Sequence, residues 1–184
     1  MEEATEQGTS FKNHVIRWGL ITAAVSIIFT MLLYAIDYTL MVQLKFLFIF
    51  LAVYLGIVIY AGIDYRNSIG GFMGYGKAWQ HGFFILALSG LVATLFSLLL
   101  YNVIDPELPQ NLVDASMENT REMMVNFGAP EDTIDEALEK ARVDTEERFT
   151  VKGTLMGYIY IAVFSAIMAL ISALFVRKNK PEMV

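Results

Sequence analysis

The sequence predicts an all-α polytopic membrane protein, with four transmembrane helices and an extracytoplasmic helical hairpin between helices three and four. Four apolar stretches, at residues 15–36, 46–63, 78–104 and 155–176, contain no charged residue except Arg17. A helix needs about 20 residues to cross a hydrocarbon core roughly 30 Å thick, so each stretch is long enough to span a bilayer. One polar, acidic insert, 105–154, separates the third stretch from the fourth.

The composition agrees with a membrane bundle. The chain has 184 residues, of which 56% are hydrophobic, and these are concentrated in four blocks instead of recurring at helix or strand period. We therefore expect one four-helix bundle and not a soluble domain. The sequence has no cysteine, which excludes disulfides, thiolate metal sites and thiol catalysis.

The first apolar stretch predicts an uncleaved span and not a signal peptide. Its apolar run of about 20 residues exceeds the roughly 7 to 15 residues that are typical of a cleaved signal. We expect residues 1–14 to form a cytoplasmic tail. The spans and short loops of 15–104 follow, then the insert, the fourth span, and a basic tail at 177–184.

The distribution of basic residues predicts the orientation. Seven of them fall on the side that the two termini share with the loop between spans two and three: Lys12, Arg17, Arg66, Lys77, Arg177, Lys178 and Lys180. Because Lys and Arg are enriched in cytoplasmic loops, both termini should be cytoplasmic and the insert periplasmic. The net charge of −6 comes from the insert, which alone carries −8.

Small residues recur at spacing four in the spans and predict seams at which helices approach closely. They are Ala52, Gly56, Ser89, Ala93, Ser97, Gly153, Gly157, Ser165, Ala169 and Ala173. The pattern favours packing within one chain but leaves open a contact between copies.

The insert predicts two helices outside the membrane. Asp105 and Pro106 end the third span, a helix runs from about Gln110 to Phe127, and Gly128 and Pro130 separate it from a second helix. The candidate partner surface consists of Leu112, Met117, Met124, Phe127, Ile134 and Leu138. Amphipathic helices need a surface to cover, which is the other helix, the ends of the spans or a partner.

The loop between spans two and three is rich in glycine. Its notable residues are Arg66, Gly70, Gly71, Gly74, Gly76 and Lys77. The spacing from Gly71 to Lys77 fits a phosphate-binding loop, but Ala78 replaces the required Ser or Thr and no strand precedes it. We therefore expect a tight cytoplasmic turn with Lys77 and Arg66 near anionic lipid headgroups, and no cofactor.

Titratable groups are sparse in the spans. Their middle thirds contain no Asp, Glu, His or Lys, and the two histidines, His14 and His81, lie towards the cytoplasmic interface. A metal between these histidines lacks an obvious carboxylate or cysteine ligand, so interfacial hydrogen bonding is favoured. We expect no catalytic, metal or cofactor site, and no enzyme.

Several segments resemble a known family. They are Trp18-Gly19-Leu20-Ile21, Tyr65-Arg66, the segment from Gly70 to Trp79, Asn102 to Pro106, and Arg177-Lys178. Together they look like the small bacterial proteins grouped as domain of unknown function 4199. The resemblance implies four helices, an extracytoplasmic insert and a Gram-negative inner membrane, and it supplies no catalytic residues.

Two functions are compatible with these features. The favoured hypothesis is a structural or interaction protein that presents its acidic insert to a protein partner. The alternative is a small transporter or channel subunit that acts as an oligomer, with Thr22, Ser26 and Thr30 along one face of span one. The expected contacts are the lipid bilayer, a protein partner at the insert and further copies of the chain in a homo-oligomer; nucleic acid is not expected.

Overall fold

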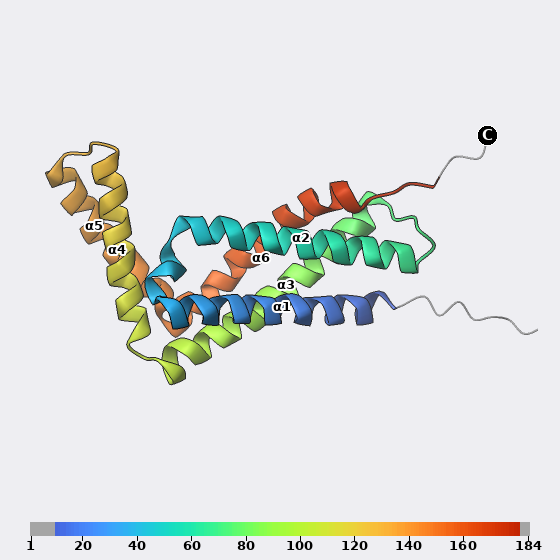
Figure 1. Cartoon of the computed structure of the whole chain (residues 1–184), viewed down its shortest axis with the longest axis horizontal. Helices are drawn as coiled ribbons and strands as arrows, with labels where there is room; N and C mark the ends of the chain where they lie inside the picture. The colour runs from blue at the N-terminus through green and yellow to red at the C-terminus, as the bar shows by residue number, and fades with distance from the viewer. Residues whose placement is uncertain (1–9, 181–184) are drawn as a thin grey trace, which may run out of the picture. The chain divides into compact units, whose positions relative to one another are not determined.

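The protein is all-helical over the part that its computed structural model describes, residues 10–180 (Figure 1). The predicted tails therefore lie partly outside the described residues, at 1–9 and 181–184. Six α-helices follow one another in this range, and it contains no β-strand.

Four of the helices are long and apolar enough to cross a membrane. They are α1 (Phe11–Ile36), α2 (Leu44–Ser68), α3 (Tyr75–Leu99), which continues through the π-helical turn η2 (Leu100–Ile104), and α6 (Val151–Val176). The four predicted spans are confirmed as helices. All four begin before the apolar block, and α2 also ends after it, whereas the other three end where their blocks end. The extension brings His14 into α1 and Asp64 into α2.

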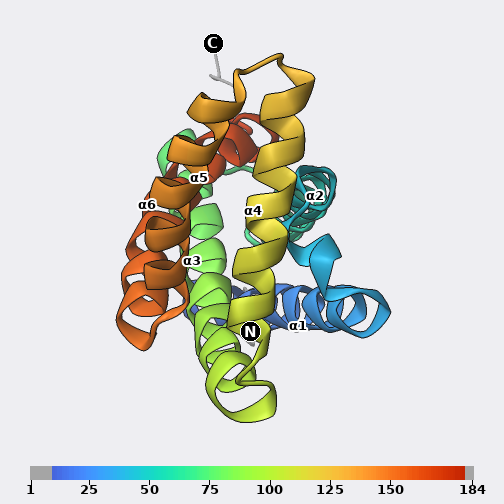
Figure 2. The same ribbon diagram turned by 90° about the vertical axis from the view of Figure 1, so that its left-hand side faces the viewer.

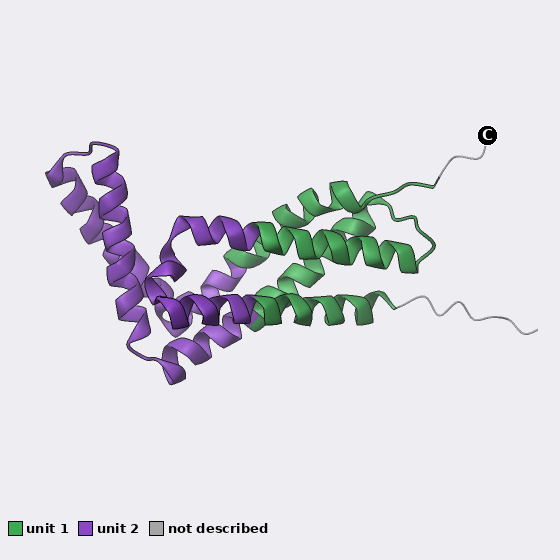
Figure 3. Ribbon diagram, viewed as in Figure 1, with its two compact units in different colours: residues 1–25, 52–92, 160–184 green, residues 26–51, 93–159 purple. Residues whose placement is uncertain are grey.

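The chain divides into two compact units, which are described separately (Figure 3). Unit 1 comprises residues 1–25, 52–92 and 160–184, and unit 2 comprises residues 26–51 and 93–159. Each of the four long helices contributes a segment to both units.

Unit 1 is built around small and branched apolar side chains. One buried cluster includes Val58, Ala61 and Ile85, and Phe11 and Trp18 pack against it. A second cluster includes Tyr65, Met73, Ala78, Ala173 and Val176. Since lipid competes with any exposed apolar contact, the close fit of such side chains is what holds helices together in a membrane.

Unit 2 contains the insert and the turn between α1 and α2. This turn is a 3₁₀ helix, η1 (Tyr38–Val42), and the Asp37 side chain accepts a hydrogen bond from the Thr39 amide at its start. The insert forms α4 (Leu108–Asn126) and α5 (Glu131–Phe149), which pack against each other (Figure 2). The helical hairpin expected from the insert is thus present.

The caps of the hairpin explain where its helices begin and end. Asp105 accepts hydrogen bonds at Oδ1 from the amides of Glu107 and Leu108, and at Oδ2 from the Tyr34 hydroxyl. Gly128 has φ of +76°, and its amide donates to the Val125 carbonyl while the Ala129 amide donates to Met124. The predicted glycine at the end of α4 is confirmed, because only glycine adopts this conformation readily.

Candidate functional site

Two histidines and an aspartate form a hydrogen-bonded row in unit 1. His14 Nδ1 lies 3.0 Å from His81 Nε2, and His14 Nε2 lies 3.1 Å from Asp64 Oδ2. The His14 and His81 residues are only 3% and 1% exposed, whereas the Asp64 side chain is 50% exposed. The row therefore runs from a group at the surface to a fully buried imidazole.

Three helices supply one residue each. His14 lies in the first turn of α1, Asp64 near the end of α2 and His81 in the second turn of α3. The glycine-rich loop reverses the chain between α2 and α3, which brings the end of one beside the start of the other. Their positions on the three helices bury His14 and His81 and leave Asp64 half exposed at the edge of the unit.

Aromatic side chains enclose the buried end of the row. The Tyr65 ring stacks on His81 with centroids 4.9 Å apart and an interplanar angle of 8°. Phe11 meets the same imidazole edge-on, with centroids 5.9 Å apart. At the surface end, Trp18 Nε1 donates to Asp64 Oδ2 at 3.3 Å. The enclosure leaves Asp64 as the member of the row that meets solvent.

The distances fix where the protons lie when both imidazoles are neutral. An ionised Asp64 only accepts, so His14 must carry its proton on Nε2 and donate it to the carboxylate. The Nδ1 atom of His14 is then a bare acceptor, and His81 Nε2–H donates to it. Every proton in the row therefore points towards Asp64.

The sequence alone underestimated this site. It placed both histidines at one end of the bundle, but it found no carboxylate beside them because the apolar block of span two ends at Ile63, one residue before Asp64. The hydrogen bonding expected of the histidines is confirmed. Among residues 10–180, no three His, Asp or Glu side chains are placed to hold a metal ion together.

A family model described as "Protein of unknown function (DUF4199)" matches residues 17–178 of the chain. The chain belongs to the DUF4199 family. Neither the curated proteins nor the solved structures include one that matches it. The matched range contains Asp64 and His81 and begins three residues after His14.

The glycine-rich turn of this DUF4199 protein is tied to the end of α6. Arg66 Nη1 donates to the Val176 carbonyl at 2.8 Å, and Met73 and Lys178 exchange two backbone hydrogen bonds of 2.9 Å each. Gly70 and Gly71 adopt φ of +93° and +81°, so the turn requires glycine at both. Lys77 Nζ lies 5.7 Å from the centre of the Tyr65 ring, next to the histidine row.

The expected glycine roles differ at the two remaining positions of this turn. Gly74 and Gly76 do not have positive φ, and a Cβ at either would meet no atom within 4 Å. The Gly74 carbonyl instead accepts from the Ala78 amide as α3 begins. The tight turn thus depends on Gly70 and Gly71.

The DUF4199 hairpin has ion pairs on its surface. Arg121 pairs with Glu131 and Asp135, and Arg142 pairs with Asp114 at 2.6 Å and with Glu146 at 3.2 Å. The hydrogen bond that the Asp114 carboxylate accepts raises the pKa of the Arg142 guanidinium. Three of these four contacts join α4 to α5, so charge as well as apolar packing connects the two helices.

The candidate partner surface of the hairpin requires correction at two positions. Leu112 and Ile134 are buried, Leu112 in a cluster with Leu100 and Leu108, so neither is available to a partner in this fold. The correction has a simple cause, since an amphipathic hairpin first covers its own apolar faces. Met117, Met124 and Leu138 are half-buried, and Phe127 is 84% exposed.

The predicted seam is partly inside the chain. Ser89, Ser165, Ala169 and Ala173 are buried, and Ala93 and Ser97 are half-buried. Ala52 and Gly56 of α2 are exposed, so these two residues form no seam within the chain.

The two glycines at the start of α6 also depart from the predicted seam. A Cβ on Gly153 would lie 1.9 Å from the backbone oxygen of Glu147, so this glycine admits the turn between α5 and α6 and not a neighbouring span. A Cβ on Gly157 would meet no atom within 4 Å.

The sequence missed the glycines at which helices of unit 1 come closest. A Cβ on Gly62 would lie 2.6 Å from a Val176 methyl, and one on Gly19 would lie 2.7 Å from Leu88. A Cβ on Gly82 would lie 2.9 Å from the Ser172 hydroxyl. Each of these glycines is tight against a side chain of another helix, and such a contact between distant residues leaves no local signal in the sequence.

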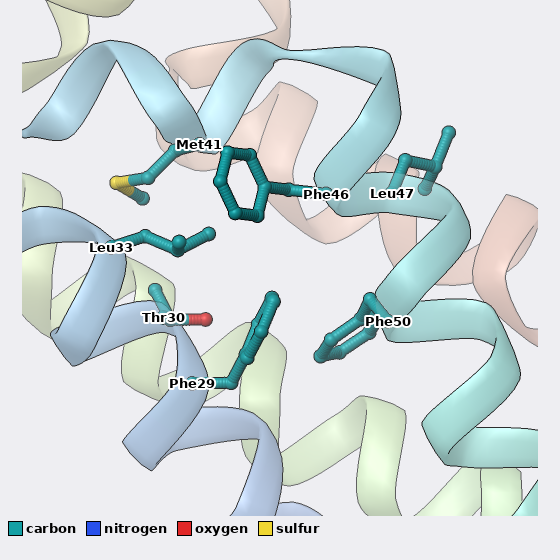
Figure 4. Close-up of a pocket in the computed structure, with 7 residues that line it drawn as sticks. All are labelled: Phe29, Thr30, Leu33, Met41, Phe46, Leu47 and Phe50. Carbon is teal, nitrogen blue, oxygen red and sulfur yellow. The ribbon is translucent and has the colours of Figure 1, made fainter.

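Unit 2 contains an apolar cavity of about 170 Å³ (Figure 4). It is lined by Phe29, Thr30, Leu33, Met41, Phe46, Leu47 and Phe50, and the Thr30 hydroxyl is the one polar side-chain group among them. These walls contain no titratable side chain that could act as an acid or base or activate the Thr30 hydroxyl. The histidine row is therefore the chemically richest place in the described chain.

Proposed function

We propose that this integral membrane protein is an interaction protein, and not an enzyme, that presents the α4–α5 hairpin to a protein partner. The tip of the hairpin supports the proposal. Phe127 is 84% exposed and Val125 54% exposed, whereas Leu112 and Ile134 of the same hairpin are buried. Exposed aromatic residues on a fixed surface are typical anchors of protein interfaces.

The tip is held in one shape. The closed turn at Gly128 fixes the backbone that follows Phe127, and the Arg121–Glu131 and Arg121–Asp135 pairs join the two helices nearby. A fixed apolar group loses little conformational entropy on binding. Methionines beside the tip, Met123 and Met124, add an adaptable apolar surface.

The charge of the hairpin suggests the chemistry of the partner. The insert carries a net charge of −8, and exposed acids flank the tip on both helices, including Glu118, Glu122, Asp132 and Glu136. An apolar pocket with a basic rim complements such a surface.

We further propose that the hairpin lies outside the cytoplasm, in the periplasm of a bacterium, with both termini in the cytoplasm. The proposal rests on the basic residues at the opposite ends of the spans, together with the membership of the DUF4199 family. The partner is then a periplasmic protein or the periplasmic part of an inner-membrane protein.

Photo-crosslinking in native membranes tests the interaction. A photoreactive phenylalanine analogue at Phe127 should capture one protein, whereas the same analogue at Val143, an exposed apolar position on α5, should not. Phe127→Ser should weaken the recovery of that protein about tenfold or more, as expected for an anchor residue. If the protein still co-purifies after deletion of 110–149, the hairpin does not bind it.

A small transporter or channel subunit is the second candidate, and the buried hydroxyls of the spans favour it. Thr22, Ser89 and Ser172 in unit 1, and Ser26 in unit 2, are each less than 5% exposed. Thr22 and Ser172 bond carbonyls of their own helices, which is also how hydroxyls are satisfied in a purely structural bundle. The interaction role is therefore favoured.

Solute flux distinguishes the two candidates. Transport predicts flux in proteoliposomes that Ser26→Leu abolishes and that Ala24→Leu, an exposed neighbour on α1, leaves intact. Absence of flux for ions and small metabolites supports the interaction role.

A further inference from the structure

The histidine row has a property that a hairpin partner does not explain. Two ring nitrogens 3.0 Å apart cannot both be bare and cannot both carry a proton, because two lone pairs or two N–H groups at this distance repel. The two facing atoms, His14 Nδ1 and His81 Nε2, therefore share one proton in their hydrogen bond. The two rings act as one titrating unit and not as two independent histidines.

We propose that Asp64, His14 and His81 form a binding site for one additional proton, which enters from the aqueous face through Asp64. In the neutral row, all N–H groups point towards the carboxylate, as described above. The proposal follows from what a second arrangement of the same contacts permits.

One added proton can be accommodated without breaking a contact. His14 then carries protons on both nitrogens and donates to Asp64 from Nε2 and to His81 from Nδ1. His81 accepts at Nε2 and carries its own proton on Nδ1. The imidazolium of His14 is paired with the adjacent carboxylate, so the charge added to the buried site is balanced.

A second added proton cannot be accommodated. Both facing nitrogens would carry protons, the His14–His81 hydrogen bond would be lost, and two imidazolium charges would lie about 3 Å apart at Nδ1 and Nε2. The site therefore binds one proton and resists the next.

The surroundings define the route and the charges that act on the site. Tyr65 and Phe11 cover the His81 ring, and Ala173 and Val176 of α6 pack in the Tyr65 cluster, so none of these offers an entry. Among residues 10–180, the charged groups that face the site are Asp64 on α2 and, across the Tyr65 ring, Lys77 on α3. The half-exposed Asp64, bonded by Trp18, is the member of the row that water reaches.

Tautomer measurements on the full chain test the proposal directly. The sequence contains two histidines, so ¹⁵N-histidine labelling in lipid nanodiscs gives a spectrum of four ring nitrogens. At high pH both rings should carry the proton on Nε2. On acidification, one proton per chain should bind, His14 should become doubly protonated, and His81 should change to the Nδ1–H tautomer.

Variants assign the signals and separate the site from its fold. Asp64→Asn should reduce the affinity of the site for the added proton about tenfold or more, because the carboxylate that balances the imidazolium is gone. The matched control, Asp114→Asn on the hairpin, should leave the titration unchanged. His14→Gln retains a donor and an acceptor while removing the site, and His81 should then keep its Nε2–H tautomer through the pH range in which the native pair changes.

Three results would overturn the proposal: two protons bound independently at one midpoint, no change of tautomer at His81, or an Asp64→Asn titration that matches the native one. Retention of the helical circular dichroism of the native chain shows that each variant is folded. The outcome does not depend on the hairpin or its partner.

Discussion

Unit 1 and the hairpin of unit 2 both contain acid–base pairs, but the pairs of unit 1 are largely buried and those of the hairpin are exposed. In unit 1 the Asp64–His14–His81 row is largely buried, and its geometry leaves one proton between two rings. In the hairpin, Arg121 and Arg142 pair with acids at the exposed surface. Burial strengthens the electrostatic interactions of the first set, so a change of one proton has a large effect there, while water screens the charges of the second set.

The same contrast applies to packing. Unit 1 brings helices together at single glycines against branched side chains, such as Gly62 against Val176. The hairpin depends on caps, on a small apolar core and on surface charge. The comparison predicts that substitutions in unit 1 have the larger effects, and that the effects decrease towards the surface of the hairpin.

The largest effect should follow Gly62→Leu. A Cβ alone would lie 2.6 Å from a Val176 methyl, and the valine side chain has little freedom to move away because it is β-branched. We expect a loss of about 3 kcal/mol or more in the free energy of unfolding, at the upper end of overpacking effects. Gly56→Leu is the control, because a Cβ at Gly56, six residues earlier on α2, would meet no atom within 4 Å. Equal thermal stability of both variants in detergent would break the comparison.

A smaller but clear effect should follow Gly153→Ala in unit 2. The new methyl would meet the Glu147 carbonyl, and the backbone of the turn from α5 to α6 must shift to admit it. We expect about 1 to 3 kcal/mol of destabilisation. Gly157→Ala, on the same helix and without a neighbour within 4 Å, should be neutral or stabilising. Thermal unfolding of the two variants in parallel distinguishes the turn from a span seam, which would require both glycines.

The next effect should follow Asp105→Ala. This change removes the acceptor for two amides at the start of α4. Loss of such a cap costs about 1 kcal/mol. Amide hydrogen exchange should accelerate in the first turn of α4 and remain unchanged in α2. Unchanged exchange near Leu108 would show that the cap is dispensable.

The smallest effect should follow Arg142→Gln. Its ion pairs with Asp114 and Glu146 are exposed, so solvent and salt screen them. We expect Arg142→Gln to change the melting temperature less than Asp105→Ala does. In high salt the variant and the native chain should melt at the same temperature. A loss as large as that of Gly153→Ala would mean that surface charge holds the hairpin together.

Local sequence signals predicted the elements of this fold because each depends on nearby residues. Apolar length predicted the four long helices, and Pro106, Gly128 and Pro130 predicted the limits of the hairpin. The candidate site depends on distant residues. His14 and His81 are 67 positions apart, and their contact depends on how α1 and α3 are rotated in the folded unit. Hydropathy also ended span two before Asp64, although the helix continues through it.

Sidedness of the hairpin tests the proposed function most directly, and the absence of cysteine makes it measurable. Single cysteines at Asn126, at the exposed end of α4, and at Asn179, beyond α6, can be treated with a membrane-impermeant maleimide in intact cells whose outer membrane is permeable to it. We predict labelling of Asn126→Cys in intact cells and of Asn179→Cys only after the inner membrane is opened. The reverse pattern would place the hairpin in the cytoplasm and contradict the proposed presentation to a periplasmic partner.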